Sequence, residues 1–164
     1  MKQKILSEKI ESKLNELIGQ ELYAMYAYKA IANWCQDAGF LRAHPFFIGE
    51  SSDEKLHAEI LEQYILDMGG VPDLKKIDKP EESFKSLTDV VYASYDMEVA
   101  LGEKYAEFAL ECVTEDALTF TKIQEFIKIQ TESIGFYGDI CSAANGLSTS
   151  KFEQLMLEKI LVKG

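Results

Sequence analysis

Glu54 and His57 have residue types and a spacing that could bind a metal ion, because they form a Glu-x-x-His motif within a long amphipathic segment. On a helix, positions i and i+3 face the same way, so one carboxylate and one imidazole can hold the same ion. Alone the motif is a weak signal, since a buried histidine is more often hydrogen-bonded in a core. Three more polar residues strengthen it, each interrupting an apolar stripe near the midpoint of its own predicted helix: Glu21, Glu98 and Gln130.

A carboxylate in such a stripe needs a partner, because burying it unpaired costs several kcal/mol. No Lys or Arg occupies these stripes to pair with the three glutamates. Carboxylate oxygens with one imidazole suit iron or manganese better than copper, and two cations about 3.5 to 4 Å apart could share Glu54 as a bridge. The pattern therefore predicts a di-iron centre at one level of a helical bundle.

The elements that must position these residues are five predicted helices, over residues 7–38, 41–68, 86–114, 118–145 and 150–162. Ser7 and Ser86 are suitable N-caps, and Ser150 with Glu153 forms a capping-box pattern. Pro45 is tolerated only in a first helical turn, so the second helix should begin within residues 41–44. No segment shows strand-like alternation, which predicts an all-α fold.

The lengths of the connections predict the topology. The first and second helices, and the third and fourth, are joined by a few residues and must form antiparallel hairpins. Residues 69–85 form one long connection, which at roughly 3.5 Å per residue can run the full length of the bundle. We therefore expect one domain, 1–164, built as a four-helix bundle with one long crossover between the second and third helices and a short fifth helix, an architecture that resembles the ferritin-like folds.

Composition limits the kinds of partner. The 164 residues are 47% hydrophobic and 27% charged, which is ordinary for a globular protein. The formal net charge of −11 argues against nucleic acid and anionic membrane surfaces and favours cations. We expect no membrane span, a cytoplasmic location without a secretory signal, and three reduced cysteines.

Three segments of the chain resemble the non-haem ferritins, and the resemblance covers nearly the whole sequence. Gln20-Glu21-Leu22-Tyr23 through Tyr28 to Asn33-Trp34-Cys35 is similar to the first helix of bacterial ferritins. Asp53-Glu54-Lys55-Leu56-His57-Ala58 is similar to the ferroxidase motif of their second helix, and Phe126-Ile127-Lys128-Ile129-Gln130 to the fourth-helix segment that carries the family's glutamine.

The resemblance implies that Glu21, Glu54 and His57 hold one iron, that Glu54 and Glu98 hold the other, and that Gln130 sits close to the second. It also implies that Tyr28, which by residue type alone is a core packing residue, hydrogen-bonds into the site and can supply an electron. The implied activity is that of a ferroxidase, which oxidises Fe(II) to Fe(III) with O₂ or H₂O₂. The implied storage form is Fe(III) mineral in a homo-oligomeric shell of 24 subunits, with the short last helix at a fourfold axis.

Several positions depart from the family pattern. Ile129 and Ser133 stand where bacterial ferritins usually carry glutamates of a third iron site, and only Glu132 is left, so a third site stays open and the two-iron H-type arrangement of animals is favoured. Lys55 replaces the bacterioferritin methionine, so no haem is expected. The acidic pore of animal ferritins would fall near 120–123, where this chain carries Phe120, Lys122 and Ile123.

Two further residues, Glu50 and His44, lie near the motif in the sequence. Glu50, one turn before Glu54, belongs either beside the centre or at the solvent edge of the bundle. His44 is expected at the surface near the start of the second helix.

Two alternative functions also stay open: a ferritin-like structural or regulatory subunit with little ferroxidase activity, and a di-iron oxidase or peroxidase that forms no cage.

Overall fold

The computed structural model describes residues 2–163 and contains five α-helices. They are α1 (Glu8–Asp37), α2 (Ala43–Asp67), α3 (Leu87–Glu115), α4 (Ala117–Ala144) and α5 (Lys151–Lys163). Each end lies within two residues of its predicted position, and Pro45 falls in the first turn of α2 as expected. Over residues 2–163 there is no strand, so the all-α prediction is confirmed. None of the helices in this range is both long and apolar enough to cross a membrane.

N-cap side chains begin three of the four long helices, α1, α3 and α4, and the sequence predicts the first two of these caps. Ser7 accepts a hydrogen bond from the backbone N–H of Ile10 at 3.2 Å, and Ser86 accepts one from Asp89 at 3.2 Å. The predicted capping box at α5 forms only in part, because Ser150 accepts from the Glu153 N–H at 3.4 Å while the Glu153 carboxylate accepts from Ser148 instead. These bonds satisfy N–H groups that have no partner within the helix.

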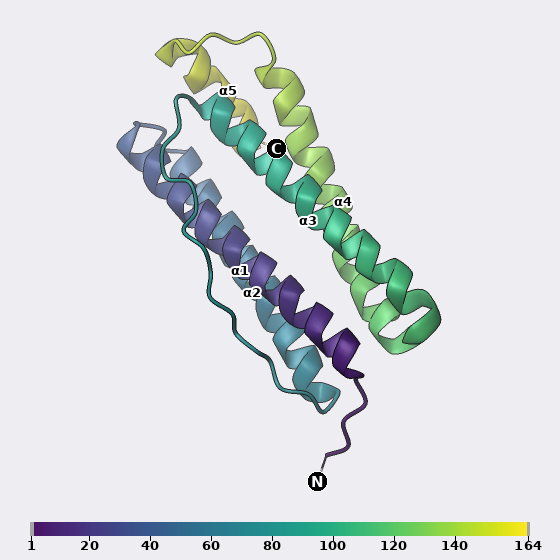
Figure 1. Ribbon diagram of the computed structural model, residues 1–164. Helices are drawn as coiled ribbons and strands as arrows, with labels where there is room; N and C mark the ends of the chain where they lie inside the picture. Colours follow the sequence, from purple (N-terminus) through teal and green to yellow (C-terminus); the bar gives the residue numbers. More distant parts are fainter. Residues whose placement is uncertain (1, 164) are drawn as a thin grey trace.

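Residues 68–86 form the long crossover and contain no helix. Figure 1 shows this segment running along the bundle, so that α2 and α3 are parallel while α1 and α2 form an antiparallel hairpin, as do α3 and α4. The crossover is fastened to α1 by two backbone N–H groups: that of Val71 donates to Glu11 at 3.1 Å and that of Asp73 donates to Asn15 at 2.8 Å.

Gly69 is required where α2 ends against the N-terminal segment. Its φ is +81°, which favours glycine, and a Cβ at this position would lie 2.3 Å from the backbone oxygen of Gln3. The N–H of Ile5 donates to the carbonyl of Met68 at 2.9 Å beside it. The chain before α1 therefore closes this end of the bundle.

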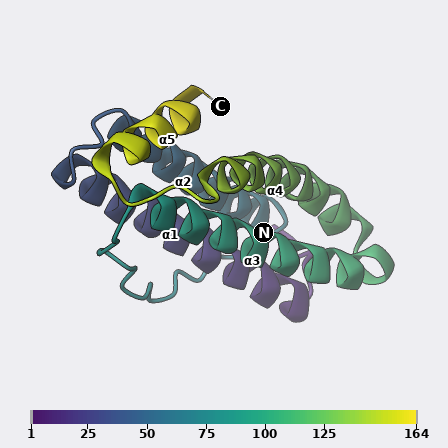
Figure 2. The same ribbon diagram turned by 90° about the horizontal axis from the view of Figure 1, so that it is seen from above.

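Helix α5 lies at the other end of the bundle (Figure 2). Two buried polar residues attach it there. Glu158 accepts hydrogen bonds from the N–H groups of Arg42 at 2.8 Å and Ala43 at 2.9 Å, at the start of α2. Gln154 accepts from the N–H of Thr88 at 2.9 Å, in the first turn of α3. Since a helix N-terminus carries partial positive charge, the Glu158 carboxylate is well placed to stabilise it.

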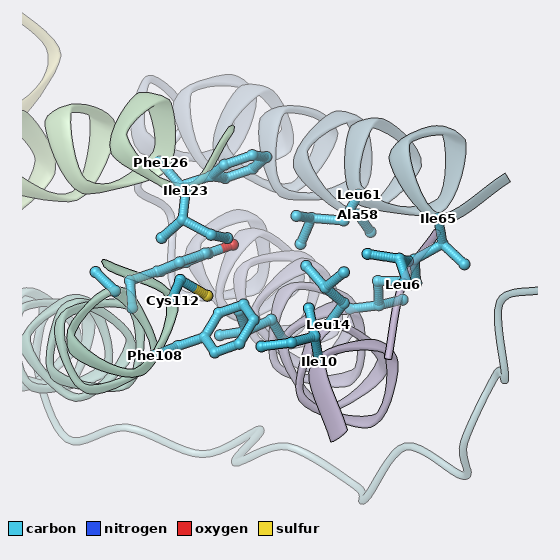
Figure 3. Close-up of a cluster of buried hydrophobic side chains, with 14 of the residues drawn as sticks. Leu6, Ile10, Leu14, Ala58, Leu61, Ile65, Phe108, Cys112, Ile123 and Phe126 are labelled. Atoms are coloured by element: carbon cyan, nitrogen blue, oxygen red, sulfur yellow. The ribbon is translucent and has the colours of Figure 1, made fainter. Parts of the chain in front are cut away.

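The core consists of two apolar clusters, one toward each end of the bundle. Figure 3 shows the first, in which Ile10 and Leu14 from α1 pack with Leu61 from α2, Phe108 from α3 and Phe126 from α4. The second cluster draws on the opposite ends of the same helices and on α5. In each of the four long helices, a buried polar side chain lies between the residues of the first cluster and the residues of the second.

Candidate metal centre

All five predicted metal-binding residues lie in the interior of the bundle. Glu21, Glu54, Glu98 and Gln130 are 0%, 3%, 1% and 3% exposed, and His57 is mostly buried. Each of the four long helices supplies at least one of them. The polar residues that interrupt the apolar stripes therefore face the interior of the bundle.

Glu21, Glu54 and His57 form the tightest part of the site. One potential ligand atom from each residue lies within 4.8 Å of the others. His57 Nδ1 is 3.0 Å from Glu54 Oε2 and 3.7 Å from Glu21 Oε2. Among residues 2–163, the buried Glu21 Oε2 has no hydrogen-bond partner. An unpaired buried carboxylate oxygen facing an imidazole and a second carboxylate is suited to receive a cation.

Glu98 and Gln130 form the other part of the site. The Gln130 side-chain amide donates to Glu98 Oε2 at 2.9 Å and to the Glu98 main-chain carbonyl at 3.2 Å. The other Glu98 oxygen accepts a hydrogen bond from Tyr28. Both oxygens of Glu98 thus accept hydrogen bonds. Glu98 is not part of the group of Glu21, Glu54 and His57, whose ligand atoms lie within 4.8 Å of one another.

Two tyrosines cross between α1 and α3 to hold the carboxylates. Tyr28 of α1 donates to Glu98 of α3, and Tyr105 of α3 donates to Glu21 of α1. The sequence prediction included Tyr28 and missed the role of Tyr105. A signal was present, because α1 and α3 each carry a glutamate followed seven residues later by a tyrosine. In antiparallel helices, that repeated spacing lets each tyrosine reach the other helix's glutamate.

Burial and neighbouring charge shift the pKa values of the site. Burial raises the pKa of Glu54 to about 9, with the adjacent Glu21 adding to the effect and His57 opposing it. For His57, burial lowers the pKa, but the attraction of the Glu21 and Glu54 carboxylates, 3.7 and 3.0 Å from its Nδ1, outweighs burial and raises the pKa to about 10. Burial also raises the pKa of Glu98, against the opposing hydrogen bonds of Tyr28 and Gln130. At neutral pH the metal-free site therefore retains protons that a cation would displace.

The other residues that the sequence singled out near the centre differ in how far they are buried. Glu50 is partly buried, and burial together with the charges of Glu98 and Asp53 raises its pKa to about 7. His44 was expected at the surface and is instead half-buried, with its Nδ1 2.8 Å from the carbonyl of Ala32. The reason is that α2 begins against α1, which turns His44 toward the hairpin. Glu132 is exposed, and Lys55 is exposed beside Glu59.

The comparisons with known proteins agree with this geometry. Residues 11–146 match the family model described as the ferritin-like domain. The chain belongs to the ferritin family. It is 28% identical over 137 residues to the bacterial non-heme ferritin of Campylobacter jejuni, covering 83% of this chain and 82% of that protein. It is 25% identical over 158 residues to a probable bacterial non-heme ferritin-like protein of Haemophilus influenzae, covering 96% of each.

Solved ferritin structures share the fold over almost the whole chain. A humanized archaeal ferritin superposes with a TM-score of 0.89 at 25% identity, covering 96% of both chains. An open pore ferritin from Archaeoglobus fulgidus superposes with a TM-score of 0.90 at 23% identity, covering 96% of this chain and 97% of that one. The second likeness bears on the fold alone. The predicted four-helix bundle with a short fifth helix is thus confirmed.

Proposed function

We propose that this ferritin is an iron-storage protein that oxidises Fe(II) at a di-iron ferroxidase centre inside each bundle. The observation that supports this most directly is the group formed by Glu21, Glu54 and His57, in which a buried carboxylate oxygen lacks a hydrogen-bond partner among the described residues. Oxygen donors with one imidazole fit iron, and the surrounding apolar clusters exclude bulk water. Iron is the substrate here and leaves as stored Fe(III).

In this proposal Glu21, Glu54 and His57 bind one iron, while Glu54 and Glu98 bind the second. Gln130 lies near the second iron and orients Glu98 through the 2.9 Å hydrogen bond. Each Fe(II) gives one electron, so two Fe(II), one O₂ and two protons yield two Fe(III) and one H₂O₂. The carboxylates offset the added positive charge, and Tyr28, hydrogen-bonded to Glu98, is placed to give a further electron.

We also propose that the chain assembles into a homo-oligomeric shell of 24 subunits in the cytoplasm. One face of α5 supports assembly, because Phe152, Met156 and Ile160 recur every four residues and are 74%, 48% and 42% exposed. Apolar residues at this spacing form a continuous stripe, which a neighbouring subunit would cover. The stripe lies on the far side of α5 from Gln154 and Glu158, which attach the helix to its own bundle.

The experiment that tests the function is stopped-flow oxidation of Fe(II), added at two irons per chain, with size-exclusion chromatography of the same sample. We expect a fast, saturable phase in a particle the size of a shell. A shell without a fast phase would refute ferroxidase activity and favour the scaffold role. A monomer or dimer with a fast phase would refute the storage shell and favour a discrete di-iron oxidase.

Two variants test whether fast Fe(II) oxidation depends on this centre. Glu54→Ala or His57→Ala should abolish the fast phase, because each removes a ligand from the three-residue group. Glu59→Ala is the matched control, since it removes an exposed glutamate from the same helix, 3.5 Å from Lys55. Fast oxidation in either site variant, with the fold intact by circular dichroism, would contradict the assignment.

A further inference from the structure

A groove runs between α1 and α3 on the side of the bundle that the crossover follows (Figure 2). It consists of two adjoining pockets. The first has a volume of about 680 Å³ and the second of about 390 Å³, and both are lined by α1, α3 and the crossover. Gln20 and Tyr23 line both pockets, so the two form one continuous groove with an aromatic ring at the junction.

Small residues keep the groove open. Ala24 and Ala27 of α1 and Ala93 and Ala100 of α3 line the second pocket. In the first pocket, a Cβ placed on Gly19 would meet no atom within 4 Å. Because side chains this short do not reach across to the opposite wall, a space remains that lies within the range of ligand pockets in proteins.

The first pocket, here called the basic pocket, reverses the charge of the chain. It is lined by five of the 17 basic residues and by three carboxylates, although acidic residues exceed basic ones by 11 in the whole chain. The five are Lys13, Lys75, Lys76, Lys79 and Lys104. A concentration of ammonium groups around one pocket attracts anions, and lysine is a common ligand of phosphate.

The ion pairs of these lysines leave them available to a ligand. Three pairs form, all between exposed side chains: Lys13 with Glu16 at 3.5 Å, Lys75 with Asp73, and Lys79 with Glu82 at 2.9 Å. Exposed pairs of this kind contribute little free energy, so they do not fix the lysines. Lys76 of the crossover and Lys104 of α3 make no ion pair among residues 2–163 and approach the pocket from different walls.

The second pocket, here called the apolar pocket, has the opposite character. Ile31, Phe84 and Leu101 line it, no lysine or arginine does, and its two charged residues are Glu81 and Asp96. A ligand that fits both pockets therefore has an anionic end and a neutral, flat body whose N–H groups can donate to carboxylates. A nucleotide has this structure, whereas a fatty acid would place a tail without donors beside two carboxylates.

We propose that this groove binds a nucleotide. Lys76 and Lys104 hold its phosphates in the basic pocket, and its base lies in the apolar pocket beside Tyr23, with the N–H groups of the base donating to Asp96 and Glu81. Aromatic rings stack on any base, because every base has a π-face. The groove contains no residue of the metal centre, so this inference does not rest on the proposed ferroxidase function.

The test is isothermal titration calorimetry of the assembled, metal-free protein with three probes: ATP, tripolyphosphate and adenosine. We expect ATP to bind more tightly than either of the others, because it alone occupies both pockets. Lys76→Ala and Lys104→Ala should each weaken ATP binding about 5-fold, the effect of losing one solvent-exposed ionic contact. Lys128→Ala is the matched control, since it removes an exposed lysine of α4 that lines neither pocket.

A further variant separates the base from the phosphates. Ala100→Trp, at an exposed position of α3, should fill the apolar pocket. It should weaken ATP binding to the level of tripolyphosphate and leave tripolyphosphate binding unchanged. If this variant does not fold, the ratio of ATP to tripolyphosphate affinity in the wild type decides the role of the base.

Three results would overturn the proposal. The first is wild-type protein that does not bind millimolar ATP. The second is ATP binding that is unchanged in both lysine variants, or adenosine that binds as tightly as ATP, because either would show that the lysines hold no phosphate. The third is equal binding of ATP and tripolyphosphate by the wild type, which would make the groove a site for polyanions alone.

Discussion

Binding of a divalent cation to the metal-free centre should release close to two protons per chain at pH 7. In the metal-free protein the pKa of Glu54 is raised to about 9 and that of His57 to about 10, so both hold a proton at neutral pH. A metal ion needs the carboxylate of the first and the neutral imidazole of the second. Both protons must therefore leave when Glu54 and His57 become ligands.

The size of the effect follows from the number of protons. When two protons are exchanged, each rise of one pH unit strengthens binding about 100-fold, which is about 2.7 kcal/mol at ~1.36 kcal/mol for each proton. Because both pKa values are raised, the effect is greatest below pH 9. It weakens as the pH passes about 9 and then about 10, where first Glu54 and then His57 are already deprotonated.

The assay is isothermal titration calorimetry with Zn²⁺, which does not change oxidation state, in two buffers of different ionisation enthalpy. The difference in apparent enthalpy between the buffers counts the protons released. Glu59→Ala, which removes an exposed glutamate of α2, should behave as wild type. Release of less than half a proton at pH 7, or an affinity that does not change between pH 6.5 and 8.5, would refute the proton-loaded site.

Three further predictions follow from the same structure. The stability of the metal-free protein should fall as the pH rises from about 5 to 9, because the folded Glu54 and His57 hold protons that the unfolded chain has lost. Thermal melts across this pH range should show the melting temperature falling without Zn²⁺ and rising with it. Tyr105→Phe should lower the free energy of unfolding by about 1 to 3 kcal/mol, since Glu21 loses a buried donor; denaturant curves at fixed protein concentration measure it, and no loss would contradict that hydrogen bond's contribution. Glu158→Ala should cost about 2 to 4 kcal/mol by the same method, because two N–H groups at the start of α2 lose their acceptor, whereas exposed Lys159→Ala should cost almost nothing.

Much of the fold could be predicted because its signals are local. Glycines, serine caps and apolar spacing mark where each helix begins and ends, and a connection of 17 residues is long enough to reach the opposite end of the bundle. The candidate ligands were also predictable, since a carboxylate or amide that interrupts an apolar stripe is visible in the sequence. Their action on iron remains a proposal that the oxidation experiments test.

Other features depend on which side chains from distant segments meet. The hydrogen bonds from Tyr28 to Glu98 and from Tyr105 to Glu21 join residues 70 and 84 positions apart. The spacing of seven residues between glutamate and tyrosine is a property of each helix alone, but the pairing depends on the register of α1 against α3. The same holds for His44, which packs against α1 although its neighbours in sequence suggest a surface position.

The sequence by itself thus determined the helices, their order and the residues that could bind a metal, because covalent spacing places side chains on one face of one helix. Only the tertiary structure decided the rest. It left one oxygen of Glu21 without a hydrogen-bond partner among the described residues, and it used Glu158 of α5 to cap α2. These contacts depend on how helices distant in sequence pack, and packing is a property of the whole bundle.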